Sequence, residues 1–311
     1  MDEKIYYYME HVDRLMKGEF VPPITAEIDP SNKCPLRCGF CMFDDYLESN
    51  RVHLNYEIYV SLLCELKELG TKSITFTGGG EPLVHPKIGC MIEEALNMGF
   101  EIGLVTNGVM LNKIEKYIDK FMFIRVSLDA YTKEMYKEVK GADFFDKVIE
   151  NIKMALTKNK TVGLSYVIND KNNNRLDIAQ ELADDLGVAY IQMKPAYVDG
   201  GTFRDYKLPH GKVVIETDRY LAEDHVPCSI ASLVGIISAT GSVYYCCQFR
   251  GDDRFKLGDL FTDSFETIWK RRLKMKPDIS KCPQCRYMNY AKCYKEIVER
   301  GTLFFKHKNF L

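Results

Sequence analysis

Short apolar runs alternate with amphipathic stretches from residue 24 to residue 194, and this alternation constrains the fold more than any other feature. The stretches between the apolar runs place apolar residues three and four positions apart, as amphipathic helices do, most clearly at 56–69, 87–99 and 175–187. Strands that alternate with helices predict a parallel sheet and an α/β fold. The predicted strands are 24–29, 73–77, 100–106, 122–128, 162–168 and 188–194.

The alternation stops near Pro195, and the chain is then irregular up to residue 225. We therefore expect a first domain at 1–195, a linker at 196–225 and a second, smaller domain at 226–311. The second domain begins with an apolar run that is interrupted at Thr240-Gly241, which predicts a β-hairpin with its turn there. Two helices are expected after the hairpin, near 264–274 and 289–301.

Composition and charge limit the kinds of partner. The 311 residues carry a formal net charge of −2 without a block of like charges, so nucleic acid is not an expected partner. No apolar stretch approaches the length of a membrane span and no export signal is present, so we expect no membrane partner and a cytoplasmic location. Eleven cysteines in a reducing compartment favour metal binding or catalysis over disulfides, particularly because they fall in groups.

The first group is Cys34, Cys38 and Cys41, in the segment NKCPLRCGFC directly after the first predicted strand. Loops at the carboxyl ends of the strands build the active sites of barrel enzymes. Three thiolates can bind three irons of a cubane cluster, which leaves the fourth iron open to a cofactor or a substrate. The alternative is a zinc site, which needs a fourth ligand that only His53 offers nearby, and the CxxxCxxC spacing is unusual for zinc.

The pattern CxxxCxΦC, with Phe40 at the aromatic position, resembles the motif of the radical S-adenosylmethionine superfamily. The resemblance covers residues 24–194 and implies a partial (β/α)6 TIM-like barrel. It also implies a 4Fe-4S cluster on the three cysteines, with S-adenosylmethionine bound to the open iron near Phe40. A reductant such as flavodoxin or ferredoxin is then expected, and cleavage gives a 5'-deoxyadenosyl radical that takes hydrogen from a small-molecule substrate.

Polar residues follow three further predicted strands, at the edge of the sheet where the cysteines are expected. The segment TGGGEP lets a ligand approach the backbone closely, and the resemblance implies that it binds the methionine amino group. The segments TNG and SLD bring further polar groups to the same edge. The cofactor contacts that the resemblance implies are Gly79, Gly80 and Glu81 after the second strand, Asn107 after the third, and Ser127 and Asp129 after the fourth.

Two predicted site residues, Asp129 and Lys194, have less specific sequence signals than the cysteines. Asp129 is equally well placed to be the N-cap of a helix. Lys194, in the segment QMKP at the end of the sixth strand, is a candidate to meet the substrate or a carboxylate.

The second group of cysteines surrounds the predicted hairpin, and its spacing resembles the SPASM and twitch domains that hold auxiliary clusters. Because Cys293 is the only cysteine that follows the CPQC pair, we expect a twitch-type domain with one auxiliary 4Fe-4S cluster. A four-thiolate zinc ribbon is the alternative. The predicted ligands are Cys228, Cys246, Cys282 and Cys285.

The remaining cysteines have different predicted roles. Cys64 and Cys90 fall on apolar helix faces, so both are expected in the core. Cys247 follows Cys246 on a predicted strand, so the two side chains should point to opposite faces. Cys247 is then buried, a ligand in place of Cys246, or a reactive thiol near the radical.

An auxiliary cluster beside a substrate radical suggests that the radical loses an electron to it. The resemblance to small twitch-type enzymes implies dehydrogenation of an alcohol carbon in a sugar or aminocyclitol, with Lys194 a candidate to assist. Alternatives are radical epimerisation with Cys247 as hydrogen donor, and peptide modification. About thirty residues before the first cluster are too few for a separate peptide-recognition domain. The non-enzyme alternative is a zinc-ribbon scaffold or a cluster carrier.

Overall fold

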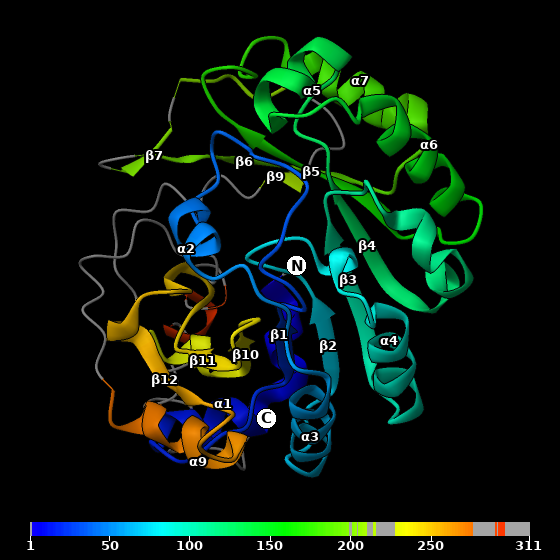
Figure 1. Ribbon diagram of the computed structural model, residues 1–311. Coiled ribbons are helices and arrows are strands. Elements are labelled where there is room, and N and C mark those ends of the chain that lie inside the picture. The colour runs from blue at the N-terminus through cyan, green and yellow to red at the C-terminus, as the bar shows by residue number, and fades with distance from the viewer. Residues whose placement is uncertain are drawn as a thin grey trace.

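The computed structural model describes residues 2–198, 201–203, 205–209, 214–215, 228–275, 290 and 292–295. The main element is a ten-stranded sheet in the order β12-β11-β10-β1-β2-β3-β4-β5-β6-β9, which is curved but not closed (Figure 1). Its centre consists of parallel strands, and all six predicted strands are confirmed. They are β1 (Thr25–Ile28), β2 (Ser73–Phe76), β3 (Glu101–Thr106), β4 (Phe121–Ser127), β5 (Val162–Ile168) and β6 (Ile191–Pro195).

Helices cover the convex side of this sheet (Figure 1). They follow the strands along the chain, as in a barrel of strand-helix units. The covering helices are α3 (Tyr56–Glu68), α4 (Ile88–Asn97), α5 (Lys133–Lys140), α6 (Phe145–Leu156) and α7 (Leu176–Leu186). The other elements of this part are η1 (Asp2–Tyr8), α1 (Met9–Met16), α2 (Asp44–Ser49), η2 (Pro82–Val84) and η3 (Leu111–Lys120).

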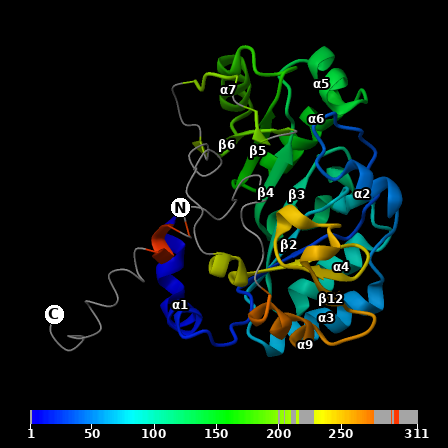
Figure 2. The ribbon, with the colours of Figure 1, turned by 90° about the vertical axis from the view of Figure 1, so that its left-hand side faces the viewer.

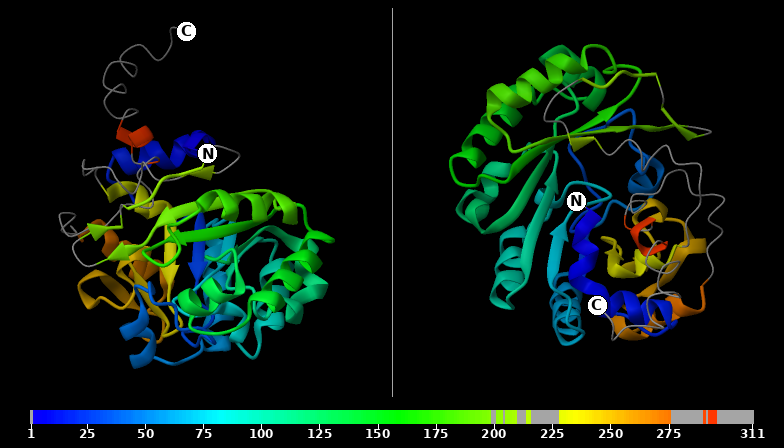
Figure 3. Two further views of the ribbon diagram at one scale, coloured as in Figure 1. Left: turned by 90° about the horizontal axis from the view of Figure 1, so that it is seen from above. Right: turned by 180° about the vertical axis from the view of Figure 1, so that it is seen from behind.

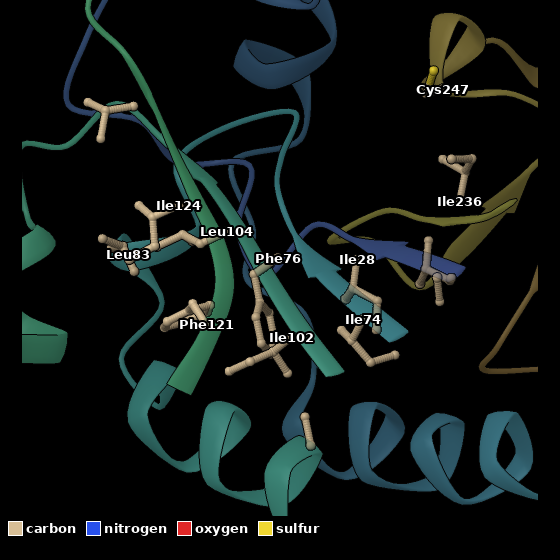
Figure 4. Close-up of a cluster of buried hydrophobic side chains, with 14 of the residues drawn as sticks. Ile28, Ile74, Phe76, Leu83, Ile102, Leu104, Phe121, Ile124, Ile236 and Cys247 are labelled. Atoms are coloured by element: carbon tan, nitrogen blue, oxygen red, sulfur yellow. The ribbon is translucent and has the colours of Figure 1, made fainter. Parts of the chain in front are cut away.

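The core lies between the sheet and these helices. Ile28, Phe76, Leu104 and Ile124 are register partners on neighbouring strands and are fully buried (Figure 4). Because side chains alternate across a strand, the residues between them point to the concave side. There the row is polar at several positions, which is where a site of this fold is expected.

The predicted hairpin is confirmed by β10 (Val234–Ile237) and β11 (Ser242–Tyr244), which pair antiparallel around Gly241 at φ +80°. The sequence did not predict that β10 also pairs in parallel with β1, so that the hairpin extends the barrel sheet. The proposed boundaries at 195 and 226 stay a prediction.

Short elements complete the C-terminal half. The helix Phe265–Lys270 lies beside α3 (Figures 2 and 3), whereas the strand Val214–Ile215 pairs with β6 at the opposite edge of the sheet. The predicted helix at 264–274 is observed as α9 (Phe265–Lys270) followed by η7 (Arg271–Leu273). Of the helix expected at 289–301, residues 290 and 292–295 are described and helical. The remaining elements are β7 (Tyr197–Val198), β8 (Gly201–Thr202), β9 (Val214–Ile215), η4 (Cys228–Leu233), η5 (Cys247–Phe249), η6 (Asp253–Phe255) and β12 (Lys256–Asp259).

No helix among the described residues is both long and apolar enough to cross a membrane.

Candidate active site

The three cysteines of the first motif lie on the loop that directly follows β1. The end of α5 supports this loop, because the backbone N–H of Arg37 donates to the Lys140 carbonyl at 3.0 Å. The thiols of Cys34, Cys38 and Cys41 are half-buried, and burial raises the pKa of each. A positively charged metal group would offset that cost by stabilising the thiolates.

The three thiols lie on one loop at the carboxyl end of β1, and all three are half-buried. Each iron of a cubane takes one thiolate, so three such thiols can bind three irons of a 4Fe-4S cluster. Among the described residues, no group of three Cys, His, Asp or Glu side chains is placed to hold a single metal ion.

The glycine-rich loop after β2 packs directly against the cysteine loop. The Gly80 N–H donates to the Ser31 carbonyl at 3.2 Å, and the Glu81 N–H donates to the Lys33 carbonyl at 2.9 Å. A Cβ atom at Gly80 would lie 2.6 Å from the Asn32 carbonyl carbon and the Lys33 oxygen. At this position the absence of a side chain therefore lets two loops of the protein meet.

The predicted cofactor contact Glu81 is buried with its carboxylate bound inside the protein. It accepts hydrogen bonds from Thr106 Oγ1 at 2.6 Å, the Asn107 N–H at 2.7 Å and the Leu83 N–H at 3.1 Å. Burial raises the pKa of Glu81, and these hydrogen bonds oppose the shift. Glu81 thus fixes the loop after β3 to the loop after β2.

Gly79 and Asn107 lie beside the segment that carries Cys34. A Cβ atom at Gly79 would lie 3.1 Å from Asn32 Oδ1, and neither polar atom of the buried Asn32 amide has a hydrogen-bond partner among the described residues. The Nδ2 of Asn107 donates to Cys34 Sγ at 3.7 Å. Hydrogen bonds to the sulfur ligands tune the reduction potential of a cluster, and unsatisfied polar atoms here fit a polar cofactor.

Asp129 is fully buried and has several partners of its own. Its carboxylate forms an ion pair with buried Lys140 and accepts hydrogen bonds from the Val167 N–H at 2.5 Å and Ser127 Oγ at 2.9 Å. The N-cap alternative was wrong, because Thr132 caps α5. Asp129 instead links the ends of β4 and β5 to α5 in this structure.

Lys140 was missed by sequence reasoning. It is 1% exposed, and its ammonium lies 5.4 Å from the ring centroid of Phe40 in the cysteine loop. A lysine in the last turn of an amphipathic helix is usually exposed to solvent, so the local sequence did not indicate that Lys140 is buried.

The concave face of β4, β5 and β6 carries a row of polar side chains. Ser127, Ser165 and Gln192 are register partners, and Arg125 Nη1 donates to Gln192 Oε1 at 2.7 Å. The predicted residue Lys194 lies two positions after Gln192 and therefore on the same face of β6. The structure thus brings Lys194 and Ser127 to one side of the sheet.

The second cysteine group is described in part. Cys282 and Cys285 lie outside the described residues, whereas Cys228 and Cys246 are half-buried. The pKa of Cys246 is raised well above its usual range, first by a hydrogen bond with the Cys247 thiol and then by burial, with Cys228 adding to the shift. Cys228 and Cys246 therefore lie near one another.

The expectation that Cys246 and Cys247 point to opposite faces was wrong. β11 ends at Tyr244, and Cys247 begins the short helix η5, so strand alternation does not apply to the pair. Cys64 and Cys90 are exposed, so their expected place in the core was also wrong. Both lie on the solvent side of helices whose apolar faces bury other residues.

Two family models match the chain. The Radical SAM superfamily model matches residues 28–182, and a model of an iron-sulfur cluster-binding domain, SPASM, matches residues 228–293. Together with the loop geometry, these matches define an enzyme class that uses iron-sulfur clusters and S-adenosylmethionine. The chain belongs to the radical SAM superfamily and has a C-terminal SPASM- or twitch-type domain. Its cofactors are S-adenosylmethionine and two 4Fe-4S clusters, one that binds S-adenosylmethionine and one that is auxiliary.

Two curated relatives match the chain over different lengths. A probable GTP 3',8-cyclase of Sulfurisphaera tokodaii is 32% identical over 181 residues, which is 55% of this chain and 56% of the relative. The chain thus spans about half the length of that cyclase. A protein of Archaeoglobus fulgidus, described as uncharacterized, is 24% identical over 348 residues, covering 96% of this chain and 82% of the relative.

Two solved structures each align with 93% of the chain. SuiB of Streptococcus suis aligns with a TM-score of 0.67 at 17% identity, covering 93% of this chain and 79% of SuiB. The protein anSMEcpe, with bound AdoMet and Cp18Cys peptide, aligns with a TM-score of 0.62 at 16% identity, covering 93% and 99%. At these identities the matches establish the fold, a partial barrel with an appended SPASM domain.

Proposed function

We propose that this radical SAM enzyme dehydrogenates an alcohol carbon of a small sugar- or aminocyclitol-type substrate. The observation that carries the proposal is the polar row on the concave face, where Arg125, Ser127, Ser165 and Gln192 offer donors and acceptors on neighbouring strands. A substrate rich in hydroxyl groups can form hydrogen bonds with such a row, whereas an apolar substrate would lie against polar groups with which it forms no hydrogen bond.

The bound cofactors supply the radical chemistry. When bound, S-adenosylmethionine and its reduced cluster would supply a 5'-deoxyadenosyl radical, and the auxiliary cluster would supply a site for one electron. We assign the first cluster to Cys34, Cys38 and Cys41. The auxiliary ligands proposed are Cys228, Cys246, Cys282 and Cys285.

The oxidation balances with one proton acceptor from the protein. The substrate carbon loses a hydrogen atom, then one electron, and its hydroxyl loses a proton, which leaves a carbonyl. Lys194, on the same face of β6 as Gln192, is our candidate for the group that meets the substrate hydroxyl. Its neutral form would accept the proton.

Two other radical reactions remain as alternatives. Peptide modification is supported by the fold that this chain shares with anSMEcpe, which aligns with 93% of the chain and whose structure contains a bound peptide. Epimerisation with Cys247 as hydrogen donor is less well supported, because Cys247 is buried in the hydrophobic cluster that includes Ile236 (Figure 4). That position suits packing or cluster ligation.

Anaerobic turnover separates these reactions. The enzyme is incubated in deuterated buffer with candidate sugars, aminocyclitols and peptides, and 5'-deoxyadenosine and product are measured together. Dehydrogenation gives one carbonyl product for each 5'-deoxyadenosine, without solvent deuterium at the attacked carbon. A stereoisomer with one deuterium, lost in Cys247→Ala while 5'-deoxyadenosine still forms, would establish epimerisation instead.

A further inference from the structure

Arg250 lies just after the cysteine pair of the auxiliary-cluster domain and is almost completely buried, with 5% of its side chain exposed. Its Nη1 donates a hydrogen bond to the Cys247 carbonyl oxygen at 3.1 Å. The guanidinium therefore fixes the backbone next to Cys246. The Arg250 guanidinium also contacts residues that are far away in the sequence, in β1 and directly after it.

Arg250 forms ion pairs with two carboxylates, Glu27 in β1 and Asp29 directly after β1. Its Nη2 lies 3.2 Å from Glu27 Oε2, and its Nε lies 2.9 Å from Asp29 Oδ2, with both carboxylates buried. Glu27 and Asp29 alternate with the core residue Ile28, so they point to the concave side. The backbone N–H of Gly79, in the glycine-rich loop, lies beside Asp29. Arg250 thus contacts the segment before Cys34 directly, and it is connected to the loop at Gly79 through Asp29.

The same turn also contacts the segment that follows Cys41. The Arg250 guanidinium carbon lies 5.7 Å from the ring centroid of Phe43. Gly251 has φ +83°, and a Cβ atom there would lie 2.4 Å from the Tyr46 ring. The Arg250-Gly251 turn is therefore packed closely against the residues behind the first cluster motif.

Arginine is suited to this place for a physical reason. Its planar guanidinium donates hydrogen bonds to the Cys247 carbonyl and to Glu27 and lies in ion-pair contact with Asp29, whereas a lysine ammonium cannot reproduce that fork. Without the guanidinium, two carboxylates would remain buried without their cation, which is strongly unfavourable. The arrangement therefore specifies one relative position of the two cysteine-bearing segments.

We propose that Arg250 is a positioning residue that holds the Cys246-Cys247 segment of the auxiliary cluster against the S-adenosylmethionine-binding loop. The inference rests on the proposed function in one respect, because a fixed separation is needed when the substrate radical gives its electron to the auxiliary cluster. Removing Arg250 should leave S-adenosylmethionine cleavage in place and weaken its coupling to product formation.

The test compares Arg250→Met, Arg250→Lys and the control Arg254→Met. Arg254 lies on the same segment, is 66% exposed and pairs with Asp252 at the surface. Each substitution is made in the intact enzyme and in a Cys34→Ala/Cys38→Ala/Cys41→Ala background that retains the auxiliary cluster alone. The readouts are the product formed per 5'-deoxyadenosine, and the EPR spectrum and reduction potential of the auxiliary cluster.

Arg250→Met should lower the product per 5'-deoxyadenosine about tenfold, the smaller end of what outer-shell substitutions cost. It should also shift the auxiliary potential to a more negative value, because a buried positive charge is removed near the ligands. Arg250→Lys should lie between Arg250→Met and the wild type, and Arg254→Met should match the wild type. An Arg250→Met enzyme with wild-type coupling, spectrum and potential would overturn the proposal.

Three further outcomes have a defined meaning. If Arg250→Met loses the auxiliary iron but keeps the first cluster, and Arg250→Lys retains both, the positioning role is supported. If Arg250→Met does not fold, Glu27→Gln/Arg250→Met removes one uncompensated carboxylate, and the same criteria apply to that variant and to Arg250→Lys. If the wild type forms no carbonyl product, the proposed function fails, while the spectrum and potential still decide the role of Arg250.

Discussion

Cys41 and Cys64 show how one residue type serves two purposes in this chain. Cys41 is half-buried in the loop after β1, whereas Cys64 is exposed on α3. Spacing identified the first, because three thiols close in sequence have few other uses in a reducing compartment. Spacing could not place the second, because an isolated cysteine behaves as a small apolar residue with no preferred side.

Replacing Cys41 by Ala should stop S-adenosylmethionine cleavage, because the first cluster would lose one of its three protein ligands. Cys64→Ala is the matched control and should cleave at the wild-type rate. Anaerobic formation of 5'-deoxyadenosine with dithionite measures both. Full cleavage by Cys41→Ala would contradict the assignment of the cluster to this motif.

Gly80 is a second residue at which a single methyl group should matter. A Cβ atom there would lie 2.6 Å from backbone atoms of Asn32 and Lys33, which cannot move like the end of a flexible side chain. Gly80→Ala should therefore destabilise the protein by about 1–3 kcal/mol, as overpacking does, and reduce cluster retention. Gly187→Ala is a control for backbone strain alone, because Gly187 has φ +73° and open space around it.

Melting temperature and iron content of the anaerobic protein measure the effect of Gly80→Ala. The strained control should lower the melting temperature without lowering iron per chain. Equal iron loss in both variants would show that general destabilisation, not the contact with the cysteine loop, explains the result.

At the scale of elements, the strands could be predicted from the sequence, but which strands pair with one another could be predicted only in part. Buried parallel strands are apolar on both faces for much of their length, which gives compact runs that sequence analysis detects. The pairing of β10 with β1 joins segments far apart in the chain, and local pattern contains no information on it. The cysteine motif is local in sequence and was therefore recognised. The contact between the cysteine loop and Lys140, at the end of α5, joins distant segments and was not predicted.

The ion pair of Lys140 with Asp129 should be important for the position of α5. Both side chains are buried, so Lys140→Met leaves a carboxylate without its cation and should cost about 3–5 kcal/mol in the free energy of unfolding. Lys133→Met, at the other end of α5, removes a lysine that is 46% exposed and should change the free energy of unfolding much less.

Thermal unfolding under anaerobic conditions measures this difference. The double variant Lys140→Met/Asp129→Asn removes the uncompensated charge and should recover part of the loss. Similar melting temperatures for Lys140→Met and Lys133→Met would mean that the buried pair contributes little to stability.

At the scale of the whole molecule, Arg250 joins the barrel to the C-terminal domain through a buried cluster of one positive and two negative side chains. One guanidinium faces Glu27 and Asp29, so the formal charge of the group is negative. Neither carboxylate could be recognised from sequence, because its partner lies more than two hundred residues away. Burial raises the pKa of Asp29 from 3.8 to about 6, although Arg250 opposes the shift.

This shift predicts how stability depends on pH. Between about pH 4 and pH 6 the folded protein binds a proton at Asp29 more tightly than the unfolded chain does, so the free energy of unfolding falls as pH rises through that window. Asp29→Asn removes the titrating group. Relative to the wild type, the variant should therefore gain about 1–2 kcal/mol between pH 5 and pH 8, because each unit of pKa shift corresponds to about 1.4 kcal/mol.

Denaturant unfolding of the anaerobic protein at several pH values between 5 and 8 provides the measurement. Asp45→Asn is the control for a carboxyl-to-amide substitution, because it replaces an exposed carboxyl on α2. The buried environment of Asp29 includes Glu27 and Arg250, so Glu27→Gln should reduce the pKa shift by removing a like charge. A constant difference between Asp29→Asn and the wild type across this range would mean that Asp29 titrates alike in the folded and unfolded chains, and that Arg250 fully offsets the cost of its burial.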